Sequence, residues 1–250
     1  MAELTGKIAL IAGGAGEVGE GIVRTFLTRG ATVIVPSRSP KKLEQLRERL
    51  GELAHGRLMT IVGEVSSLSG AARIREWIEL IFGKLDIVIA SLGEWRQSSQ
   101  MIETSLADWH SVLDNNLTPH FVTARIFLPL LAKQPNAAYL FINGDAAENP
   151  IPHSGLLSIA AAAQLMLKDV LVAEMQDISS GNNTVRINTL MVCNYVASRS
   201  RLQPHPEWLT ADEVGAYAAY LASEAAAELH GETIRFKDRA QLAKLDAVAA

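Results

Sequence analysis

Three glycines, Gly13, Gly16 and Gly19, stand three residues apart in the stretch GGAGEVG, between an apolar run and an amphipathic one. A turn of this kind lets the backbone bend sharply, approach a phosphate group closely and present the free N–H groups of a helix N-terminus to its charge. The same spacing also occurs where a strand simply packs against a helix. Because the turn is at the first connection between a predicted strand and a predicted helix, it favours a site for a dinucleotide pyrophosphate.

Ser37 and Arg38 follow the second apolar run, in VIVPSRS, where a dinucleotide site contacts the adenosine ribose. An acidic residue there would accept a hydrogen bond from the ribose 2′-hydroxyl of NAD, whereas a hydroxyl and a guanidinium suit a 2′-phosphate. The pattern therefore favours NADP(H) over NAD(H). Two alternatives stay open: Arg38 is only a solvated loop residue, or the chain binds no dinucleotide.

Glu17 lies inside the glycine turn. A carboxylate about 6 Å from a pyrophosphate would repel it by a few kcal/mol at an effective dielectric constant near 20. If a dinucleotide binds here, we therefore expect the Glu17 side chain to point away from it.

Four further reactive side chains follow the later apolar runs: Asp145, His153, Cys193 and Tyr195. An aspartate directly after a strand is most often a turn residue, and a lone histidine is usually a surface or core residue. Cys193 has no evident base beside it and is expected to be a small buried hydrophobe. Tyr195, four residues before Arg199, either places a phenol near a bound cofactor or packs its own loop.

The elements that must position these residues alternate along the chain. Short apolar runs are followed by stretches in which apolar residues recur at helical spacing. Strands are predicted at about 8–11, 32–35, 58–62, 85–92, 139–142, 185–192 and 233–236. Continuous apolar strands joined by helices predict a parallel sheet that is covered on both faces. We therefore expect a single doubly wound, Rossmann-like α/β domain with about seven strands.

Helix boundaries are marked by capping residues. Ser39-Pro40 begins a charged helix, with proline at its first position. Thr104 is predicted to cap a helical region that runs, with interruptions, to about residue 133. The stretch from Thr210 to Glu213 is a capping box for a further helix. The alanine-rich stretch at 153–169 is predicted to form the helix between the fifth and sixth strands.

The chain is expected to form one domain. Its 250 residues allow one domain or two, and 48% hydrophobic and 20% charged residues indicate a globular chain. Because no Pro-, Gly- or Ser-rich linker interrupts the alternating elements, we expect a single domain over residues 1–250. Residues 194–209 are the expected loop on the substrate side. Residues 237–250 are a C-terminal tail, which either forms a short amphipathic helix or frays.

The charge pattern argues against several kinds of partner. The formal net charge is −4 and no basic run exceeds Lys41-Lys42, which disfavours nucleic acid. The N-terminal stretch lacks the pattern of a signal peptide, and no stretch reaches the roughly 18 to 20 uncharged apolar residues of a membrane span. One cysteine permits neither an internal disulfide nor a cysteine metal cluster. We expect a cytoplasmic protein that binds a small molecule, without a metal or a membrane partner.

Seven segments of the chain together resemble the short-chain dehydrogenase/reductase family in their order, spacing and residue class. They are GGAGEVG, VPSRSPKKL, GEVSS, GKLDIVIASLG, LADWHSVLDNNLTPHF, VRINTL and EVGAYAAYLASEAAAELHGETI. The resemblance runs from about Lys7 to Phe236. It implies a Rossmann-like oxidoreductase that binds NAD(P)(H) and forms a homodimer or homotetramer through the helical regions at 104–133 and 153–169.

The resemblance also implies which residues would line the cofactor. The pyrophosphate would meet Gly13, Gly16, Val18 and Gly19; the adenosine 2′ position, Ser37 and Arg38; the adenine, Glu64 and Val65; and the ribose beside the fourth strand, Ala90 and Gly93. These contacts are mostly made by the backbone or by shape, so substitution harms them little. The stretch from Ala90 to Gly93, ASLG, stands where the family has Asn-Asn-Ala-Gly.

The family's catalytic residues are mostly missing. Its enzymes use a Ser, a Tyr and a Lys, the last two spaced as YxxxK, with a supporting Asn. The Asn matches Asn116, whereas the Ser, Tyr and Lys positions fall on Gly144, Leu157 and Ala161. No tyrosine or lysine lies between Gly144 and Gln164, so no shift of the alignment restores the motif.

This loss has a direct chemical consequence. Hydride delivery to a carbonyl creates an alkoxide, and a tyrosine whose pKa is lowered by a neighbouring lysine supplies the proton that it needs. A positioned acid contributes typically about 10² to 10⁴ in rate, so ordinary dehydrogenase activity should be weak or absent. Two hypotheses remain. One is a nucleotide-binding protein with little or no such activity; the other is an active NADP-dependent oxidoreductase whose proton donor is Tyr195, Asp145, water or the substrate.

Overall fold

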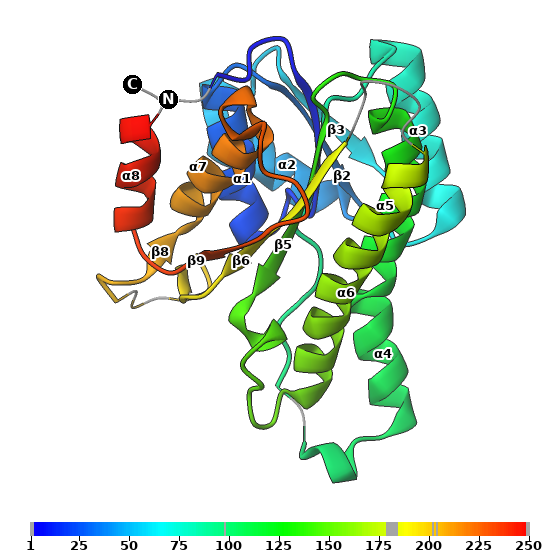
Figure 1. Ribbon diagram of the computed structural model, residues 1–250, viewed down its shortest axis with the longest axis vertical. Coiled ribbons are helices and arrows are strands. Elements are labelled where there is room, and N and C mark those ends of the chain that lie inside the picture. The colour runs from blue at the N-terminus through cyan, green and yellow to red at the C-terminus, as the bar shows by residue number, and fades with distance from the viewer. Residues whose placement is uncertain (1–2, 98, 179–184, 202, 204, 249–250) are drawn as a thin grey trace.

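A parallel seven-stranded sheet forms the centre of the molecule, in the order β3-β2-β1-β4-β5-β6-β9 (Figure 1). The computed structural model describes residues 3–97, 99–178, 185–201, 203 and 205–248. The strands are β1 (Ile8–Ala12), β2 (Thr32–Ser37), β3 (Leu58–Val62), β4 (Ile87–Ala90), β5 (Ala138–Gly144), β6 (Arg186–Val192) and β9 (Thr233–Phe236). The order reverses between β1 and β4, where Leu10 lies between Ile34 of β2 and Val88 of β4. The predicted doubly wound α/β architecture is confirmed.

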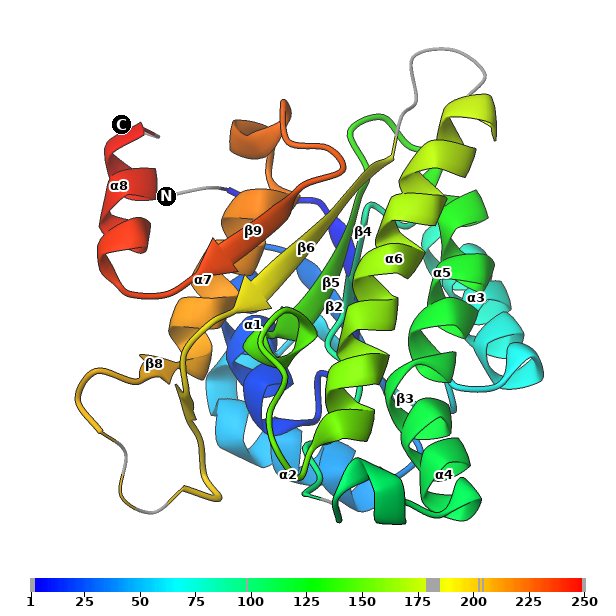
Figure 2. The same ribbon diagram turned by 60° about the horizontal axis from the view of Figure 1, so that its bottom comes forward.

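Helices cover both faces of this sheet (Figures 1 and 2). One face carries α1 (Glu17–Thr28), α2 (Pro40–Leu50) and α7 (Ala211–Ala222), and the other carries α3 (Leu68–Phe82), α5 (Thr118–Leu131) and α6 (Gly155–Ile178). The helix α4 (Leu106–Asn116) packs against α6, and α8 (Ala240–Val248) follows the last strand. Short elements are β7 (Val196–Ala197), β8 (Leu209–Thr210) and 3₁₀ turns at Gly51–Ala54, Met101–Glu103, Asp145–Ala147 and Glu224–Ala226.

Two hydrophobic clusters join the helices to the two faces of the sheet. Successive residues of β1 point alternately into each cluster. Ala9 and Ile11 pack with α1, α2 and α7, whereas Leu10 packs with α3, α5 and α6. All five residues of β1 are buried, as expected of a central parallel strand. This packing fixes the carboxyl ends of neighbouring strands and therefore the loops that follow them.

Capping confirms two of the predicted helix starts, those of α2 at Ser39 and α7 at Thr210, and corrects a third. Thr210 and Glu213 form the predicted capping box of α7, with both reciprocal hydrogen bonds present. The predicted cap at Thr104 is wrong. The helix α4 begins at Leu106, so Ser105 is its N-cap residue and the Ser105 hydroxyl accepts a hydrogen bond from Asp108 N (3.0 Å). The Thr104 hydroxyl instead donates to the Gln100 carbonyl in the preceding turn.

The helical region predicted at 104–133 divides into α4 and α5 at Leu117. Pro119 has no N–H and cannot donate to the carbonyl four residues earlier, so a new helix begins around it. The strand predicted at 85–92 is also shorter, Ile87–Ala90. The Ile8 N–H is taken by the Asp86 carboxylate (2.8 Å), so the ladder between β1 and β4 starts after that residue.

The C-terminal tail takes the helical one of its two predicted alternatives, α8, and apolar residues of this helix pack against the core. Just before it, Arg239 donates hydrogen bonds to Glu213 (2.5 Å) and to the carbonyl oxygens of Pro206 (2.9 Å) and Trp208 (2.6 Å). The tail therefore fastens one end of the 194–209 segment to α7.

The helix α6 is long and apolar enough, over Gly155–Met175, to cross a membrane by length and composition. The sequence expectation differed because it counted only uncharged residues, and Lys168 and Asp169 interrupt this helix. Lys168 is buried and donates to the Gly231 carbonyl at 2.5 Å. Core helices of soluble proteins pass the same test, so α6 is weak evidence for a membrane span.

Candidate functional site

The glycine turn between β1 and α1 is closely packed against the loop after β4. Gly13 has a φ of +86°, and a Cβ there would lie 1.8 Å from the Ser91 carbonyl oxygen. A Cβ on Gly19 would lie 2.1 Å from the Gly13 carbonyl oxygen. Gly16 is the N-cap of α1 and has no side chain to occupy the helix N-terminus. The turn therefore requires glycine and leaves the start of α1 accessible to an anion.

A cavity of about 280 Å³ opens at the carboxyl ends of β1, β2, β3 and β4. Seven of the residues predicted to line a cofactor surround it: Gly13, Gly16, Ser37, Arg38, Glu64, Val65 and Gly93. The other three do not line it. Ala90 is fully buried in β4, Val18 packs against the core, and Gly19 supports the turn from behind.

Two charged residues line the cavity without having been predicted, Lys42 and Glu94. Lys42 is four residues after Arg38 and belongs to the first turn of α2, which the Ser39 hydroxyl caps by accepting a hydrogen bond from Lys42 N (3.3 Å). Because the sequence predicts a helix start at Pro40, the place of Lys42 in the first turn of that helix, four residues after Arg38, could have identified it as a neighbour of Arg38. Arg38 and Lys42 give the cavity two cationic side chains at its β2 side.

Arg38 forms an ion pair with Glu64 across the cavity rim, with 3.8 Å between Nη1 and Oε1. A hydrogen bond from the Ser66 hydroxyl (2.6 Å) and the charge of Arg38 lower the pKa of Glu64, which stays ionised. The Arg38 side chain is 73% exposed, so its guanidinium has further N–H groups for an anion.

Glu17 points away from this cavity. Its carboxylate accepts hydrogen bonds from the backbone N–H (3.0 Å) and the hydroxyl (2.8 Å) of Ser200. Partial burial raises the pKa of Glu17, but hydrogen bonds from Ser198 and Ser200 and the charge of Arg199 outweigh it, so the pKa lies below its ordinary value. The charge in the glycine turn is therefore directed toward the 194–209 segment.

The three positions at which the resemblance implies the family's Ser, Tyr and Lys lie where β5 meets α6. Gly144 ends β5, and a Cβ there would have no atom within 4 Å. Leu157 and Ala161 are one turn apart near the start of α6. The Asn143 side chain donates to the Ala161 carbonyl at 2.9 Å and so ties the strand to the helix. These three positions carry no titratable group.

Residues 7–200 match the family model described as short chain dehydrogenase. The chain belongs to the short-chain dehydrogenase family. Among curated short-chain relatives, D-threitol dehydrogenase of Mycolicibacterium smegmatis is 27% identical over 243 residues, covering 91% of this chain and 90% of the relative. An uncharacterized oxidoreductase of Bacillus subtilis, YvrD, is 23% identical over 260 residues, covering 93% and 95%.

Solved short-chain dehydrogenase structures have the same fold. One from Mycobacterium ulcerans superposes with a TM-score of 0.85 at 18% identity, over 96% of this chain and 91% of that one. A short-chain oxidoreductase from Pseudomonas aeruginosa, described as containing an atypical catalytic center, gives 0.84 at 23% identity, over 94% and 97%. At sequence identities of 18% and 23%, these superpositions show only that the fold is shared.

Asn116, which the resemblance implies is the family's supporting asparagine, is buried. Its side-chain oxygen accepts a hydrogen bond from Glu94 N (2.9 Å) and faces Gly93. The Gln164 amide donates to the Asn116 carbonyl at 2.7 Å. Asn116 therefore holds the loop after β4, and Gln164, which the sequence did not single out, holds Asn116.

Asp145 and Cys193 are neighbours at the carboxyl ends of β5 and β6. Asp145 begins a 3₁₀ turn and accepts a hydrogen bond from the Asn149 side chain (2.9 Å). Burial and the nearby Asp145 carboxylate raise the pKa of the Cys193 thiol to about 11. The thiol is therefore protonated at neutral pH, which disfavours a nucleophilic role.

Tyr195 packs against other residues of the 194–209 segment. Its ring is tilted on Trp208 with 5.4 Å between centroids, and the Arg201 guanidinium lies 5.2 Å from the Tyr195 ring centroid. Arg199 pairs with Glu20 on α1 instead. This geometry supports the packing alternative for Tyr195.

Within the described residues, no group of three or more His, Cys, Asp and Glu is placed to hold a metal ion.

His120 of α5 supports the cavity loop from below and makes folding sensitive to pH. The ring is fully buried, and Nε2 donates to the Leu92 carbonyl at 3.0 Å, while Nδ1 has no hydrogen-bond partner. Burial lowers the pKa of His120 from 6.5 to about 4. Between these values the unfolded chain binds a proton here and the folded chain does not, so stability falls as the pH is lowered.

We expect this histidine to cost about 2.5 kcal/mol of the free energy of unfolding between pH 7 and pH 4.5. His120→Gln keeps a donor for Leu92 and removes the titration. Urea unfolding of both proteins at pH 7 and pH 4.5 measures the difference: the wild type should lose more stability than the variant. Equal losses would show that His120 is not the responsible group.

Proposed function

We propose that this short-chain dehydrogenase binds NADP(H) in preference to NAD(H) and has weak or absent ordinary dehydrogenase activity. The observation that carries the proposal is the contrast between two parts of one crevice. The glycine turn and the cavity with Arg38 and Lys42 have the features of a dinucleotide site. The helix beside it presents Leu157 and Ala161 where the family has its proton donor and the lysine that tunes it.

The residues around the cavity fit a dinucleotide. The backbone at Gly13 and Gly16 would face the pyrophosphate, Arg38 and Lys42 the 2′-phosphate, and Val65 the adenine. NADP(H), when bound, supplies or accepts a hydride at its nicotinamide ring. The chain's own contribution would be to bind and orient it. No described side chain at positions 144, 157 or 161 would donate a proton to an alkoxide.

Arg38→Ala is expected to raise the Kd for NADPH roughly 10- to 100-fold, because one charge-assisted contact to the 2′-phosphate is lost. The affinity for NADH, which lacks that phosphate, should stay the same. The measurement is quenching or blue shift of nicotinamide fluorescence on titration with protein.

The matched control for this variant is Arg47→Ala. Arg47 lies on α2, the helix that follows Arg38; it donates to the Thr60 hydroxyl (2.9 Å) and does not line the cavity, so both affinities should be unchanged. An unaltered Kd for NADPH in Arg38→Ala would contradict the assignment of the 2′-phosphate. No fluorescence response of the wild type to either nucleotide would contradict dinucleotide binding as a whole.

The second candidate function is an active oxidoreductase with a relocated proton donor. Asp145 favours it, because this carboxyl group follows Gly144 directly at the carboxyl end of β5. A panel of carbonyl and alcohol substrates with NADP(H) or NAD(H) separates the two functions. Turnover that is lost in Asp145→Asn or Tyr195→Phe would support the second candidate, whereas no turnover across the panel would support the first.

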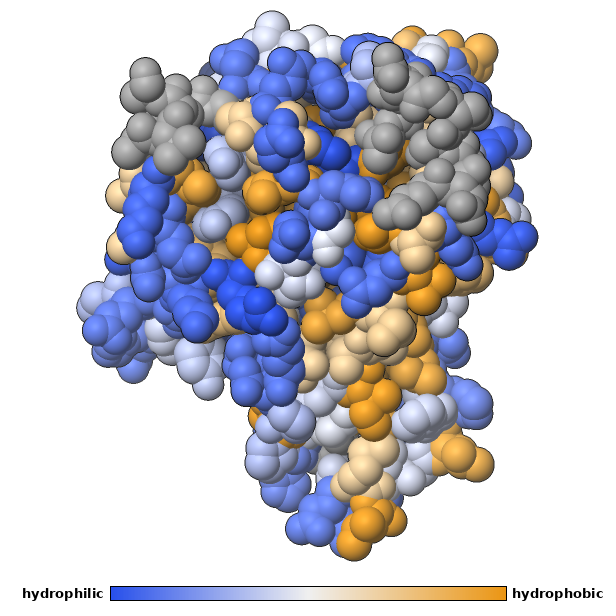
Figure 3. Space-filling view, viewed as in Figure 1, coloured by the Kyte–Doolittle hydropathy of each residue, from blue (hydrophilic) through white to orange (hydrophobic). Residues whose placement is uncertain are grey.

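We also propose a cytoplasmic homodimer or homotetramer that acts on a small molecule, without nucleic-acid or membrane partners. Figure 3 shows apolar side chains along the part of the molecule that is formed by α4, α5 and α6. Exposed apolar residues there include Phe121 on α5 and Ile159, Met166 and Val170 on α6. Burying this stripe against a second copy would remove it from water. Sedimentation of the wild type as a monomer at micromolar concentration would exclude this assembly.

A further inference from the structure

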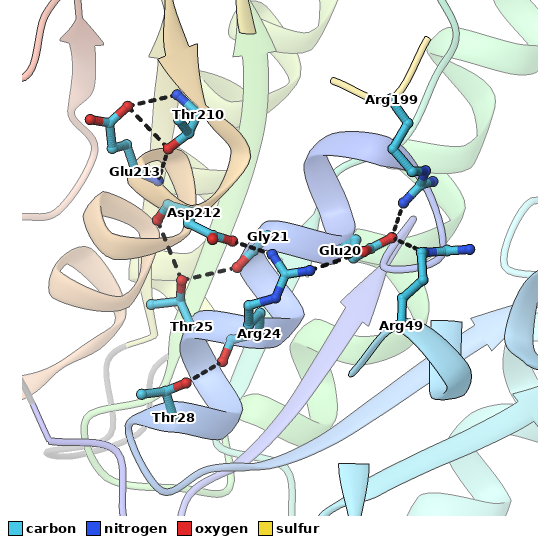
Figure 4. Close-up of polar contacts among 10 residues, drawn as sticks. All are labelled: Glu20, Gly21, Arg24, Thr25, Thr28, Arg49, Arg199, Thr210, Asp212 and Glu213. Atoms are coloured by element: carbon cyan, nitrogen blue, oxygen red, sulfur yellow. Dashed lines mark hydrogen bonds and ion pairs between the residues drawn. The ribbon is translucent and has the colours of Figure 1, made fainter. Parts of the chain in front are cut away.

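A buried carboxylate, Glu20 on α1, joins three parts of the chain (Figure 4). Its side chain is 6% exposed and accepts hydrogen bonds from Arg24 one turn later (3.0 Å), from Arg49 of α2 (2.8 Å) and from Arg199. Arg199 belongs to the 194–209 segment. A carboxylate this buried is stable only when cations and donors compensate it.

The compensation extends to two further carboxylates. Arg24 also pairs with Asp212 of α7 at 2.7 Å. Glu17, three residues before Glu20, receives the two hydrogen bonds from Ser200 and the field of Arg199. The cluster thus holds three carboxylates and three guanidinium groups. Arg24 and Arg49 belong to helices. The third guanidinium of the cluster, Arg199, belongs to the 194–209 segment. The charge balance of the cluster therefore depends on the position of that segment.

The position of this cluster connects it to the cavity. Glu17 is the first residue of α1 and directly follows Gly16, which lines the cavity. A pyrophosphate at the start of α1 would add negative charge beside the helix turn that carries Glu17 and Glu20. Without Arg199, two carboxylates would oppose that anion with only the two helical arginines beside them.

We propose that Arg199 and Ser200 form a clamp that neutralises Glu17 and Glu20 and thereby makes the start of α1 able to accept a dinucleotide pyrophosphate. Arg199 is then a positioning residue for the cofactor and makes no contact with it. This inference rests on the proposed dinucleotide binding. Because coupling between two sites is reciprocal, a bound pyrophosphate also strengthens the hold of the clamp on the 194–209 segment.

The opposing view is that these contacts only fasten the 194–209 segment to α1. The two views predict different signs for two variants. Arg199→Gln removes a positive charge and Glu17→Gln removes a negative one, and both variants loosen the segment. If the clamp acts through charge, Arg199→Gln weakens NADPH binding and Glu17→Gln strengthens it. If the clamp is only a fastener, the two variants change the affinity in the same direction.

The experiment is a titration of the full chain with NADPH, at about 0.02 M and about 0.5 M salt. At low salt we expect a roughly fivefold to tenfold rise in Kd for Arg199→Gln and a fall of similar size for Glu17→Gln, with both effects reduced at high salt by screening. Arg199→Lys should restore most of the affinity. Ser200→Ala keeps every charge and should change Kd less than Arg199→Gln does.

The outcomes separate this inference from the proposed function. Wild-type binding with both variants shifted in the same direction, or with neither shifted, would overturn the clamp and leave dinucleotide binding intact. A wild type that binds neither NADPH nor NADH would overturn both. Thermal unfolding of each variant identifies a misfolded protein, and Arg199→Lys then carries the test, since it retains the charge and a donor. A loss of affinity in Arg199→Lys as large as in Arg199→Gln would also contradict the clamp.

Discussion

Gly21→Ala is expected to destabilise the fold by at least about 3 kcal/mol, which corresponds to a Tm lower by roughly 6 to 12 °C in a domain of this size. Gly21 lies where α1 crosses α7. A Cβ there would lie 2.2 Å from the Ala211 carbonyl carbon and 2.3 Å from its oxygen. A Cβ on Gly215 would in turn lie 2.6 Å from the Gly21 carbonyl oxygen. Because the obstacles are backbone atoms, the helices must separate to admit a methyl group.

Thermal unfolding followed by circular dichroism measures this effect. Gly144→Ala is the matched control, since a Cβ at Gly144 meets nothing within 4 Å and its φ of −119° suits any residue. The Tm of the control should stay within about 2 °C of the wild type. A Gly21→Ala protein with the wild-type Tm would show that α1 and α7 can separate at this contact without a loss of stability.

Arg186→Met should cost about 4 kcal/mol of the free energy of unfolding, because it leaves the carbonyl groups at the end of α7 without donors. The Arg186 guanidinium is buried and donates to the carbonyl oxygens of Leu221 (2.8 Å), Ala222 (3.2 Å), Ser223 (3.0 Å) and Ala226 (2.9 Å). These are the last turn of α7 and the residues after it. Methionine replaces the apolar stem and none of the hydrogen bonds.

Urea unfolding at pH 7 gives the size of this loss. Arg235→Met is the control: Arg235 also belongs to a strand of the sheet, β9, but pairs with Glu148 at the surface, with 47% of its side chain exposed. Exposed pairs contribute little, so the control should lose less than about 1 kcal/mol of the free energy of unfolding. Equal stability of Arg186→Met and the wild type would show that water replaces the guanidinium at these carbonyls.

Features that depend on residues close together in the chain were predictable from the sequence. The strands, the glycine turn between β1 and α1 and the capping box at Thr210 each involve fewer than about a dozen neighbouring residues. The error at Thr104 arose because two adjacent hydroxyl groups, Thr104 and Ser105, can each cap a helix, and only the preceding turn decides between them. Seven of ten predicted cofactor residues surround the cavity because strand ends meet at one edge of a parallel sheet.

Features that join distant segments were not predictable. Arg49 and Arg199 are 29 and 179 residues from Glu20, their shared partner. Nothing in the pattern of α1 distinguishes Glu20 from an ordinary surface glutamate. Arg186 is the first residue of β6 and resembles a solvent-exposed strand end, yet its partners are carbonyl groups 35 to 40 residues later. Backbone acceptors have no residue type and therefore no sequence signal.

The hydrogen bond from Asn143 to the Ala161 carbonyl separates the framework of this crevice from its chemistry. It holds β5 and α6 together through an amide and a backbone oxygen, without a hydrogen bond from the side chains at 144, 157 and 161. A side chain placed at position 144, where a Cβ would have no atom within 4 Å, would therefore leave this link intact. The crevice is thus suited to redesign by substitution at that position.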